Sequence, residues 1–172
     1  MLDKKYLTYI EKKITVSEDP FPHSVINNFL PLEIAKKIEQ EFISLNTLVT
    51  AGSEQFQKSK KLFHDYSKMP FVLKKTIDFF HSQDFLDILE KKFNLKNLLA
   101  DWKLFGGGLH ESPRGGFVKV HSDFSYSRKS KLRRRLNLLL YLNSNWDENW
   151  GGALELWDKK MTSIKKIVPP LI

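Results

Sequence analysis

The sequence predicts an α+β domain in which a helical first part is followed by antiparallel strands. Apolar residues recur at helical spacing up to about residue 100, and after that point the helical spacing disappears. Glycines then punctuate the chain at positions 106–108 and 115–116, between short apolar segments. Short strands joined by glycine turns are typical of a sandwich or jelly roll. We therefore expect the helices to pack on one face of such a sheet.

Amphipathic segments predict the helices of the first part. One follows the N-terminus, one follows Pro31, which suits a first helical turn, and two follow Pro70. Their apolar positions are Leu2, Tyr6, Ile10 and Ile14, then Ile34, Ile38, Phe42 and Leu45, then Leu73, Ile77 and Phe80, and finally Phe85, Leu86, Leu89 and Phe93. The polar stretch 47–59 predicts a surface loop.

Four segments of the second part predict strands: residues 117–120, 136–142, 153–157 and 163–168. The segment 136–142 is a continuous apolar run, which indicates a strand buried on both faces. Asn137, Leu139 and Tyr141 would share one face of that strand. Asn137 is then a candidate buried polar group, and a buried amide needs a hydrogen-bond partner.

Composition excludes several classes of protein. The chain has 172 residues, the size of one domain, and it contains no cysteine, so we exclude a disulfide scaffold, a cysteine-ligated metal site and a thiol nucleophile. The 28 basic residues exceed the 20 acidic ones, which gives a net charge of +8. No apolar stretch is long enough to span a bilayer, and the N-terminus lacks a secretory signal. We expect a soluble, cytoplasmic protein with no membrane partner.

His121 and Asp123 form the sharpest local feature. They follow the predicted strand 117–120, and side chains two residues apart on an extended chain point the same way. An imidazole and a carboxylate would therefore converge on one point, as two thirds of a 2-His-1-carboxylate facial triad, which leaves open positions on iron. On the tripeptide alone, a surface His and Asp in a turn is the favoured interpretation.

Three ordered blocks surround this pair. In residues 115–124, two glycines precede a strand that carries the His-x-Asp motif; in residues 134–143, a basic residue opens a strand that ends in Tyr-Leu-Asn; and in residues 146–156, a Trp-Asp turn leads to Gly-Gly and the next strand. This series resembles the iron(II)- and 2-oxoglutarate-dependent dioxygenases of the prolyl 4-hydroxylase type. The resemblance covers residues 104–170, and residues 21–31 resemble the same family more weakly.

The resemblance implies an antiparallel double-stranded β-helix, the jelly roll of this family, and an oxygenase that hydroxylates a C–H bond. It implies that His121 and Asp123 bind Fe(II), and that Tyr141 helps to hold 2-oxoglutarate. Asn137 and His110 are further candidates for cosubstrate binding, although a rim position also explains His110. The implied cofactors are Fe(II) and 2-oxoglutarate, with ascorbate optional. A prolyl residue in a protein is the implied substrate, with a free amino acid or another small molecule as the alternative.

In the family, a second histidine and a basic residue that binds 2-oxoglutarate come from later strands. No histidine follows His121, and the chain closes on the apolar residues Leu171 and Ile172. We therefore expect a single, incomplete domain over residues 1–172, with helical support over 1–100 and jelly-roll strands over 101–172, the last strands missing. Open sheet edges would then promote self-association.

A basic run occupies residues 128–135, where six of the eight residues are Lys or Arg. It could contact phosphates or attract an acidic cosubstrate, but a solvated loop at the mouth of the site is the simpler interpretation. We do not expect nucleic acid as the main partner. A basic nucleic-acid-binding protein and a truncated, metal-deficient, inactive homologue both remain alternatives.

Overall fold

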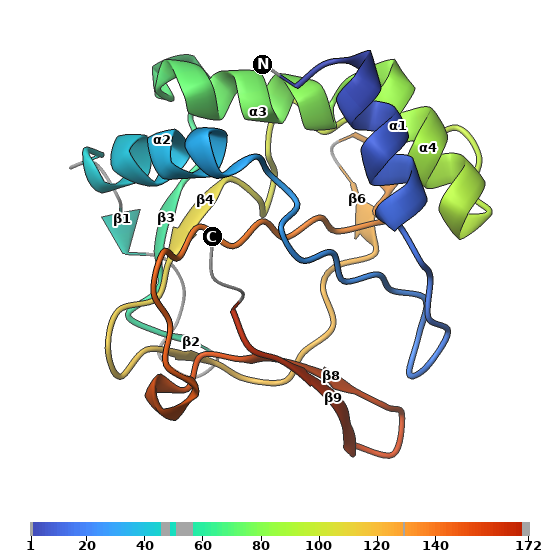
Figure 1. Ribbon diagram of the computed structural model, residues 1–172. Helices are drawn as coiled ribbons and strands as arrows, with labels where there is room; N and C mark the ends of the chain where they lie inside the picture. Colours follow the sequence, from blue (N-terminus) through green and yellow to red (C-terminus); the bar gives the residue numbers. More distant parts are fainter. Residues whose placement is uncertain (1, 46–48, 51–56, 129, 170–172) are drawn as a thin grey trace.

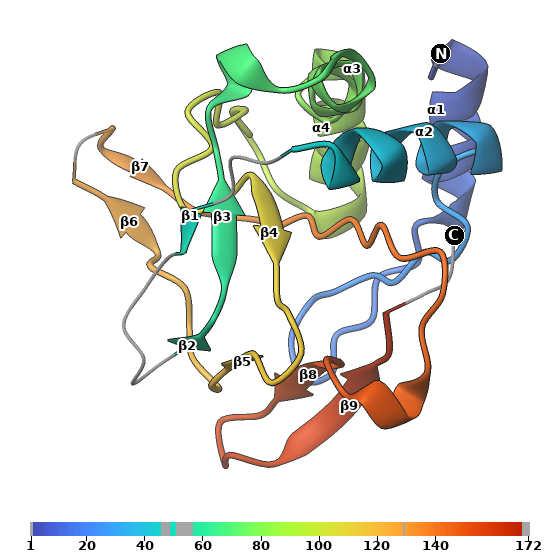
Figure 2. The same ribbon diagram turned by 90° about the vertical axis from the view of Figure 1, so that its left-hand side faces the viewer.

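The computed structural model describes residues 2–45, 49–50, 57–128 and 130–169. The α-helices among them all lie in the first part of the chain: α1 (Lys4–Lys13), α2 (Leu32–Ile43), α3 (Phe71–Phe80) and α4 (Gln83–Phe93). They gather at one side of the molecule, and most of the strands lie at the other side (Figures 1 and 2). The helices predicted from apolar spacing are confirmed.

Local chemistry explains where these helices begin and end. Asp3 accepts a hydrogen bond from the backbone N–H of Tyr6 at 2.9 Å and so caps α1. Ser82 caps α4 in the same way, whereas α2 and α3 each follow a proline, Pro31 and Pro70. Helix α4 ends at Asn94, whose left-handed backbone (φ 50°) terminates the helix.

The strands are short and form separate antiparallel sheets. One sheet joins β1 (Val49–Thr50), β3 (Lys61–Phe63) and β4 (Leu109–Glu111) in the order β1-β3-β4. Three strand pairs complete the described sheets: β2 (Gln57–Lys58) with β5 (Phe117–Val118), β6 (Tyr126–Ser127) with β7 (Leu132–Arg133), and β8 (Leu154–Trp157) with β9 (Ser163–Ile167). Two short 3-10 helices lie at Tyr66–Lys68 and Glu148–Trp150.

Two apolar cores hold the helices together. The first lies between α2, α3 and the β3–β4 pair, and its buried members are Leu30, Ala35, Ile38, Phe63, Met69, Leu73 and Leu109. The register of β3 and β4 places Phe63 opposite Leu109, so both side chains enter this core. The second core lies between α1, α3 and α4, with Ile10, Ile14, Phe79 and Phe85 as its buried members.

The mixture of helices and small strands agrees with the α+β prediction, but a jelly roll is not shown. The described strands form small separate sheets instead of two continuous ones. The strands predicted near 117–120, 153–157 and 163–168 are present as β5, β8 and β9, with β5 shorter than expected.

The prediction of a strand buried on both faces over residues 136–142 is wrong. The described chain has no strand there, because no described segment pairs with its backbone. One side is covered, since Leu140 and Leu142 pack against the first core. The other side is open, and Leu139 is 59% exposed. Self-association through such an open edge stays a prediction.

No helix in the described part of the chain is long and apolar enough to cross a membrane. Several sequence expectations fall on residues outside the described ranges. These are the apolar residues 171 and 172, position 129 of the basic run, and residues 47–48 and 51–56 of the expected surface loop.

Candidate functional site

His121 and Asp123 lie three and five residues beyond the end of β5, after a bend at Val120 and on chain without strand pairing. The Nε2 atom of His121 lies 3.4 Å from the Oδ1 atom of Asp123. Both side chains remain accessible, with exposed fractions of 52% and 40%. The structure therefore brings the two predicted ligands together, although their role as metal ligands stays a prediction.

A backbone contact fixes the proton on the His121 ring. The Nδ1 atom lies 2.7 Å from the carbonyl oxygen of Lys119, and a carbonyl can only accept a hydrogen bond, so Nδ1 carries the proton. In the neutral imidazole, Nε2 then presents a lone pair toward the negative Oδ1 of Asp123. Nε2 of His121 and Oδ1 of Asp123 are both electron-rich, so a cation bound between them, or a second proton on the ring, would be stabilised there. This backbone hydrogen bond is also the usual support for a metal-binding histidine.

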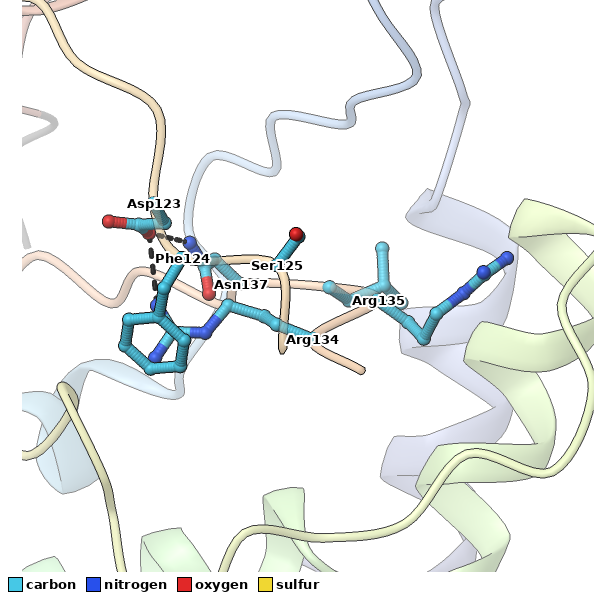
Figure 3. Close-up of a pocket in the computed structure, with 7 residues that line it drawn as sticks. Asp123, Phe124, Ser125, Arg134, Arg135 and Asn137 are labelled. Carbon is cyan, nitrogen blue, oxygen red and sulfur yellow. Dashed lines mark hydrogen bonds and ion pairs between the residues drawn. The ribbon is translucent and has the colours of Figure 1, made fainter. Parts of the chain in front are cut away.

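The second carboxylate oxygen of Asp123 faces a different set of groups. Its Oδ2 atom accepts a hydrogen bond from Nη1 of Arg134 at 3.1 Å and another from Nδ2 of Asn137 (Figure 3). Sequence reasoning placed Arg134 in a solvated basic run, but its side chain is only 19% exposed. The sequence signal for its role was the basic residue at the start of the segment that ends in Tyr-Leu-Asn.

Arg134 is held from two further directions. Its guanidinium carbon lies 3.9 Å from the centre of the Phe124 ring, a cation–π contact. Its Nη2 atom donates to the carbonyl of Phe105 at 2.8 Å. Gly106 makes this approach possible, because a Cβ atom there would lie 2.9 Å from Nη2 of Arg134. The glycine also has a φ of +70°, which L side chains rarely adopt.

A shallow pocket of about 170 Å³ adjoins these groups and is lined by residues 123–125 and 134–137 (Figure 3). Ligand pockets for drug-sized molecules usually measure about 300–1,000 Å³, so this pocket suits only a small group.

Asn137 does reach the site, but it is exposed rather than buried as predicted. The reason is that the segment 136–142 has no strand partner, so the side chain that faces away from the core meets solvent. Tyr141 lies on the same extended segment, and burial raises the pKa of its hydroxyl. That hydroxyl therefore stays protonated at neutral pH and can donate a hydrogen bond.

His110 lies on β4, opposite Leu62 of β3. Strand alternation places its side chain on the opposite face from the buried Leu109. Loss of water around the ring and the positive charge of Lys60 lower the pKa of His110, while the negative charge of Asp123 acts in the opposite direction. Near neutral pH, the ring is therefore mainly uncharged and within electrostatic reach of Asp123.

A facial triad needs three ligands, and the predicted pair His121 and Asp123 would provide two of them. Among the described residues, no group of three or more His, Asp or Glu side chains could hold a metal ion. The pair alone has the donor types, the proximity and the ring orientation of two facial-triad ligands, and a third ligand is not among the described groups.

The basic run contains strand β7 of the β6–β7 pair. Tyr126 pairs with Arg133 and Ser127 pairs with Leu132, so the pairing begins two residues after the site residue Phe124 and ends one residue before Arg134. Arg128, Lys131, Arg133 and Arg135 are exposed, as expected for a solvated segment. The expected loop is therefore a hairpin whose base is part of the candidate site.

The segment that carries this geometry is also the segment that matches a known family. Residues 107–171 match the 2OG-Fe(II) oxygenase superfamily. The matched range contains His110, His121, Asp123, Asn137 and Tyr141. The 2OG-Fe(II) oxygenase match supports a general oxygenase function, with Fe(II) and 2-oxoglutarate as the cofactors that this superfamily implies. No curated protein and no solved structure is significantly similar to the chain.

Proposed function

We propose that the chain is a 2OG-Fe(II) oxygenase whose iron is bound in part by His121 and Asp123. The observation that carries this proposal is the pair of facing donor atoms, Nε2 and Oδ1, separated by 3.4 Å within the segment that matches the superfamily. When bound, Fe(II) and 2-oxoglutarate would supply the oxidising chemistry that hydroxylates a substrate C–H bond. The third protein ligand would be a group outside the described set.

The residues of the chain have separate tasks in this proposal. The carbonyl of Lys119 holds the proton of His121 on Nδ1 and leaves Nε2 free to bind the metal. Tyr141, whose hydroxyl is protonated at neutral pH and whose pKa burial raises further, would donate to a carboxylate of 2-oxoglutarate. Asn137 and the mainly neutral His110 would contact the cosubstrate from neighbouring segments.

The substrate is proposed from the resemblance to prolyl 4-hydroxylases, which favours a prolyl residue in a protein. The openness of the site supports a macromolecular substrate. His121 and Asp123 are both accessible, and exposed apolar side chains of Phe117, Val118 and Val120 lie next to them in the chain.

The test is an anaerobic titration of the 172-residue chain with Fe(II), followed by measurement of succinate formed from 2-oxoglutarate in the presence of proline-containing peptides. We expect His121→Ala and Asp123→Ala each to weaken Fe(II) binding. The exposed His64, which lies outside the site, gives the matched control His64→Ala, which should leave binding unchanged. Equal binding by all four proteins would contradict the proposal.

A metal-deficient, inactive homologue is the competing function. The observation that favours it is that the described residues include no group of three metal donors. An absence of both Fe(II) binding and succinate formation would support this alternative.

Nucleic-acid binding is a second candidate, supported by the β6–β7 hairpin. Tyr126 pairs with the exposed Arg133 in this hairpin, is itself 46% exposed and could stack on a base. Each lost phosphate contact reduces the salt dependence of binding, by about one unit of log–log slope. We expect Arg133→Gln to reduce that slope for single-stranded nucleic acid if this function is real. An unchanged slope would exclude the hairpin as the binding surface.

A further inference from the structure

The two oxygens of the Asp123 carboxylate have separate surroundings. Oδ1 faces Nε2 of His121, whereas Oδ2 is occupied by Arg134 and Asn137. A free carboxylate can turn about its last side-chain bond and can offer a metal one oxygen or both. Two hydrogen bonds to a single oxygen oppose that rotation, so this carboxylate offers mainly one oxygen.

Arg134 is itself well fixed. The Phe124 ring lies under the guanidinium, the Phe105 carbonyl accepts from Nη2, and the backbone N–H of Arg134 donates to the carbonyl of Ser125 at 3.0 Å. The last bond closes the base of the β6–β7 hairpin and so fixes where Arg134 stands relative to Asp123. Fixed partners of this kind are what hold a metal ligand in its binding orientation.

We propose that Arg134 and Asn137 are positioning residues for Asp123. By holding Oδ2, they direct Oδ1 alone toward the metal position beside His121 and make Asp123 a one-oxygen ligand. This inference rests on the proposed function, since it assumes that a metal binds at His121 and Asp123. It assigns the base of the basic hairpin to the site, while the exposed arginines around it have no such role.

The alternative to this proposal is that the positive charge of Arg134 opposes metal binding, and the two can be distinguished by experiment. A positive group near a metal position repels the cation, so removing that charge should by itself strengthen metal binding. Loss of orientation should weaken metal binding, and loss of an outer-shell partner typically lowers metal affinity about 10- to 100-fold. Substitution of Arg134 should therefore lower the metal affinity if Arg134 positions Asp123, and raise it if Arg134 only repels the cation.

The experiment uses Co(II) as the probe, because its absorption spectrum reports the number and geometry of its ligands. The full chain, Arg134→Gln, Asn137→Ala and Arg133→Gln are titrated with Co(II), and binding is followed by absorption and calorimetry. We expect Arg134→Gln and Asn137→Ala to bind about 10- to 100-fold more weakly and to show an altered spectrum. Arg133→Gln removes the same charge from an exposed neighbouring position, so it should bind as tightly as the parent or slightly more tightly.

The opposite results would overturn the inference. Tighter binding by Arg134→Gln would show that Arg134 competes with the metal for Asp123. Unchanged affinity and spectrum in Asn137→Ala, which alters no charge, would show that Oδ2 needs no holding. If Arg134→Gln fails to fold by circular dichroism, Arg134→Lys and Asn137→Ala still decide the question, since lysine retains the charge without the planar fork.

The result for the parent chain separates this inference from the proposed function. Parent binding that does not depend on His121 and Asp123, or no parent binding, would overturn the proposed metal site and the inference with it. Parent binding that depends on both residues, with no effect of Arg134 or Asn137 substitution, would overturn the inference alone.

Discussion

The residues before position 100 and those after it bury their apolar side chains to very different extents. Most buried apolar residues of the described chain belong to the helices and their flanking segments, and after residue 100 only Leu109, Leu156 and Pro169 are buried apolar residues. Phe105, Leu139 and Trp150, all in the second region, are more than half exposed. A helix satisfies its backbone locally, whereas a strand needs a partner from elsewhere in the chain. The first region is better buried because its helices form their backbone hydrogen bonds locally, whereas the strands of the second region depend on partners elsewhere in the chain.

This contrast can be measured because the two regions carry different spectroscopic probes. The four tryptophans, Trp102, Trp146, Trp150 and Trp157, all lie after residue 100. The α-helices of the described chain all end before it. Tryptophan fluorescence therefore follows the second region, and far-ultraviolet circular dichroism follows mainly the first.

The largest expected effect is in the helical core. Phe85 is 1% exposed and contacts the rings of Phe29, Phe79 and Phe80. We expect Phe85→Ala to lower the free energy of unfolding by about 3–5 kcal/mol, measured by denaturant titration with circular dichroism. Leu139→Ala is the matched change in the second region and should cost less than about 0.5 kcal/mol, because Leu139 is 59% exposed. Similar losses for the two variants would contradict the contrast.

The next effect compares two glutamates on helix α2. The carboxylate of Glu41 accepts from the backbone N–H groups of Val72 at 3.0 Å and Leu73 at 2.9 Å, and so caps α3 from a neighbouring helix. Glu39 accepts from the N–H of Ser144 in the second region at 3.0 Å. We expect Glu41→Ala to cost about 1–2 kcal/mol, because it leaves two partly buried donors without their acceptor.

Glu39→Ala should cost less, below about 0.5 kcal/mol, because its partner is exposed to water. The measurement is again denaturant unfolding, with both probes recorded. If Glu39→Ala costs as much as Glu41→Ala, the second region supports the helices more strongly than its burial indicates.

The same division explains what could be predicted from the sequence. Helices α1 to α4 were predictable because apolar spacing and capping residues such as Asp3 and Ser82 act within a few residues. Strand β3 was not predicted, since its pairing with β4 joins residues about fifty positions apart. The buried strand over 136–142 was predicted from apolar content alone, which cannot show whether a partner exists.

The candidate site follows the same pattern. The approach of His121 to Asp123 was predicted from their spacing of two residues, since side chains at that spacing on an extended chain share one side. The contact of Arg134 with Asp123 was not, since it depends on the register of the β6–β7 hairpin. The resemblance singled out a basic residue at position 134, but nothing in the sequence indicated that its side chain contacts Asp123.

Two left-handed residues give a smaller test. Asn94 ends α4 with a φ of 50°, and Met161 lies in the β8–β9 turn with a φ of 61° and is 64% exposed. Left-handed backbone costs an ordinary L residue roughly 1–2 kcal/mol, but asparagine tolerates it. We expect Met161→Gly to stabilise the second region by about 1 kcal/mol, seen in the fluorescence transition. Asn94→Gly should change the free energy of unfolding, measured from the dichroism transition, by only a few tenths of the value expected for Met161→Gly.

If the two regions unfold together, the gain from Met161→Gly should appear in both transitions. If it appears only in fluorescence, the second region unfolds on its own. No gain in either transition would show that the turn relaxes without cost.

The smallest effect concerns a contact between the regions, where the ring of His81 at the end of α3 lies 4.6 Å from the ring of Trp102, measured between centroids. Burial lowers the pKa of His81 below its ordinary value of 6.5, and the charges of Asp101 and Asp78 oppose that shift. The unfolded chain then binds this proton at a higher pH than the folded chain does. The contribution of His81 to stability is therefore complete above about pH 6.5 and declines as the pH falls toward the lowered pKa.

We expect His81→Phe to remove this contribution, so that the variant loses less stability than the parent as the pH is lowered from about 6.5. Phenylalanine keeps an aromatic ring against Trp102 and removes Nδ1, a buried atom for which the described residues provide no hydrogen-bond partner. The variant should thus be at least as stable as the parent at neutral pH. Parallel stability curves for the two proteins would show that the His81 ring is solvated, and hence that Trp102 does not hold the two regions together at this point.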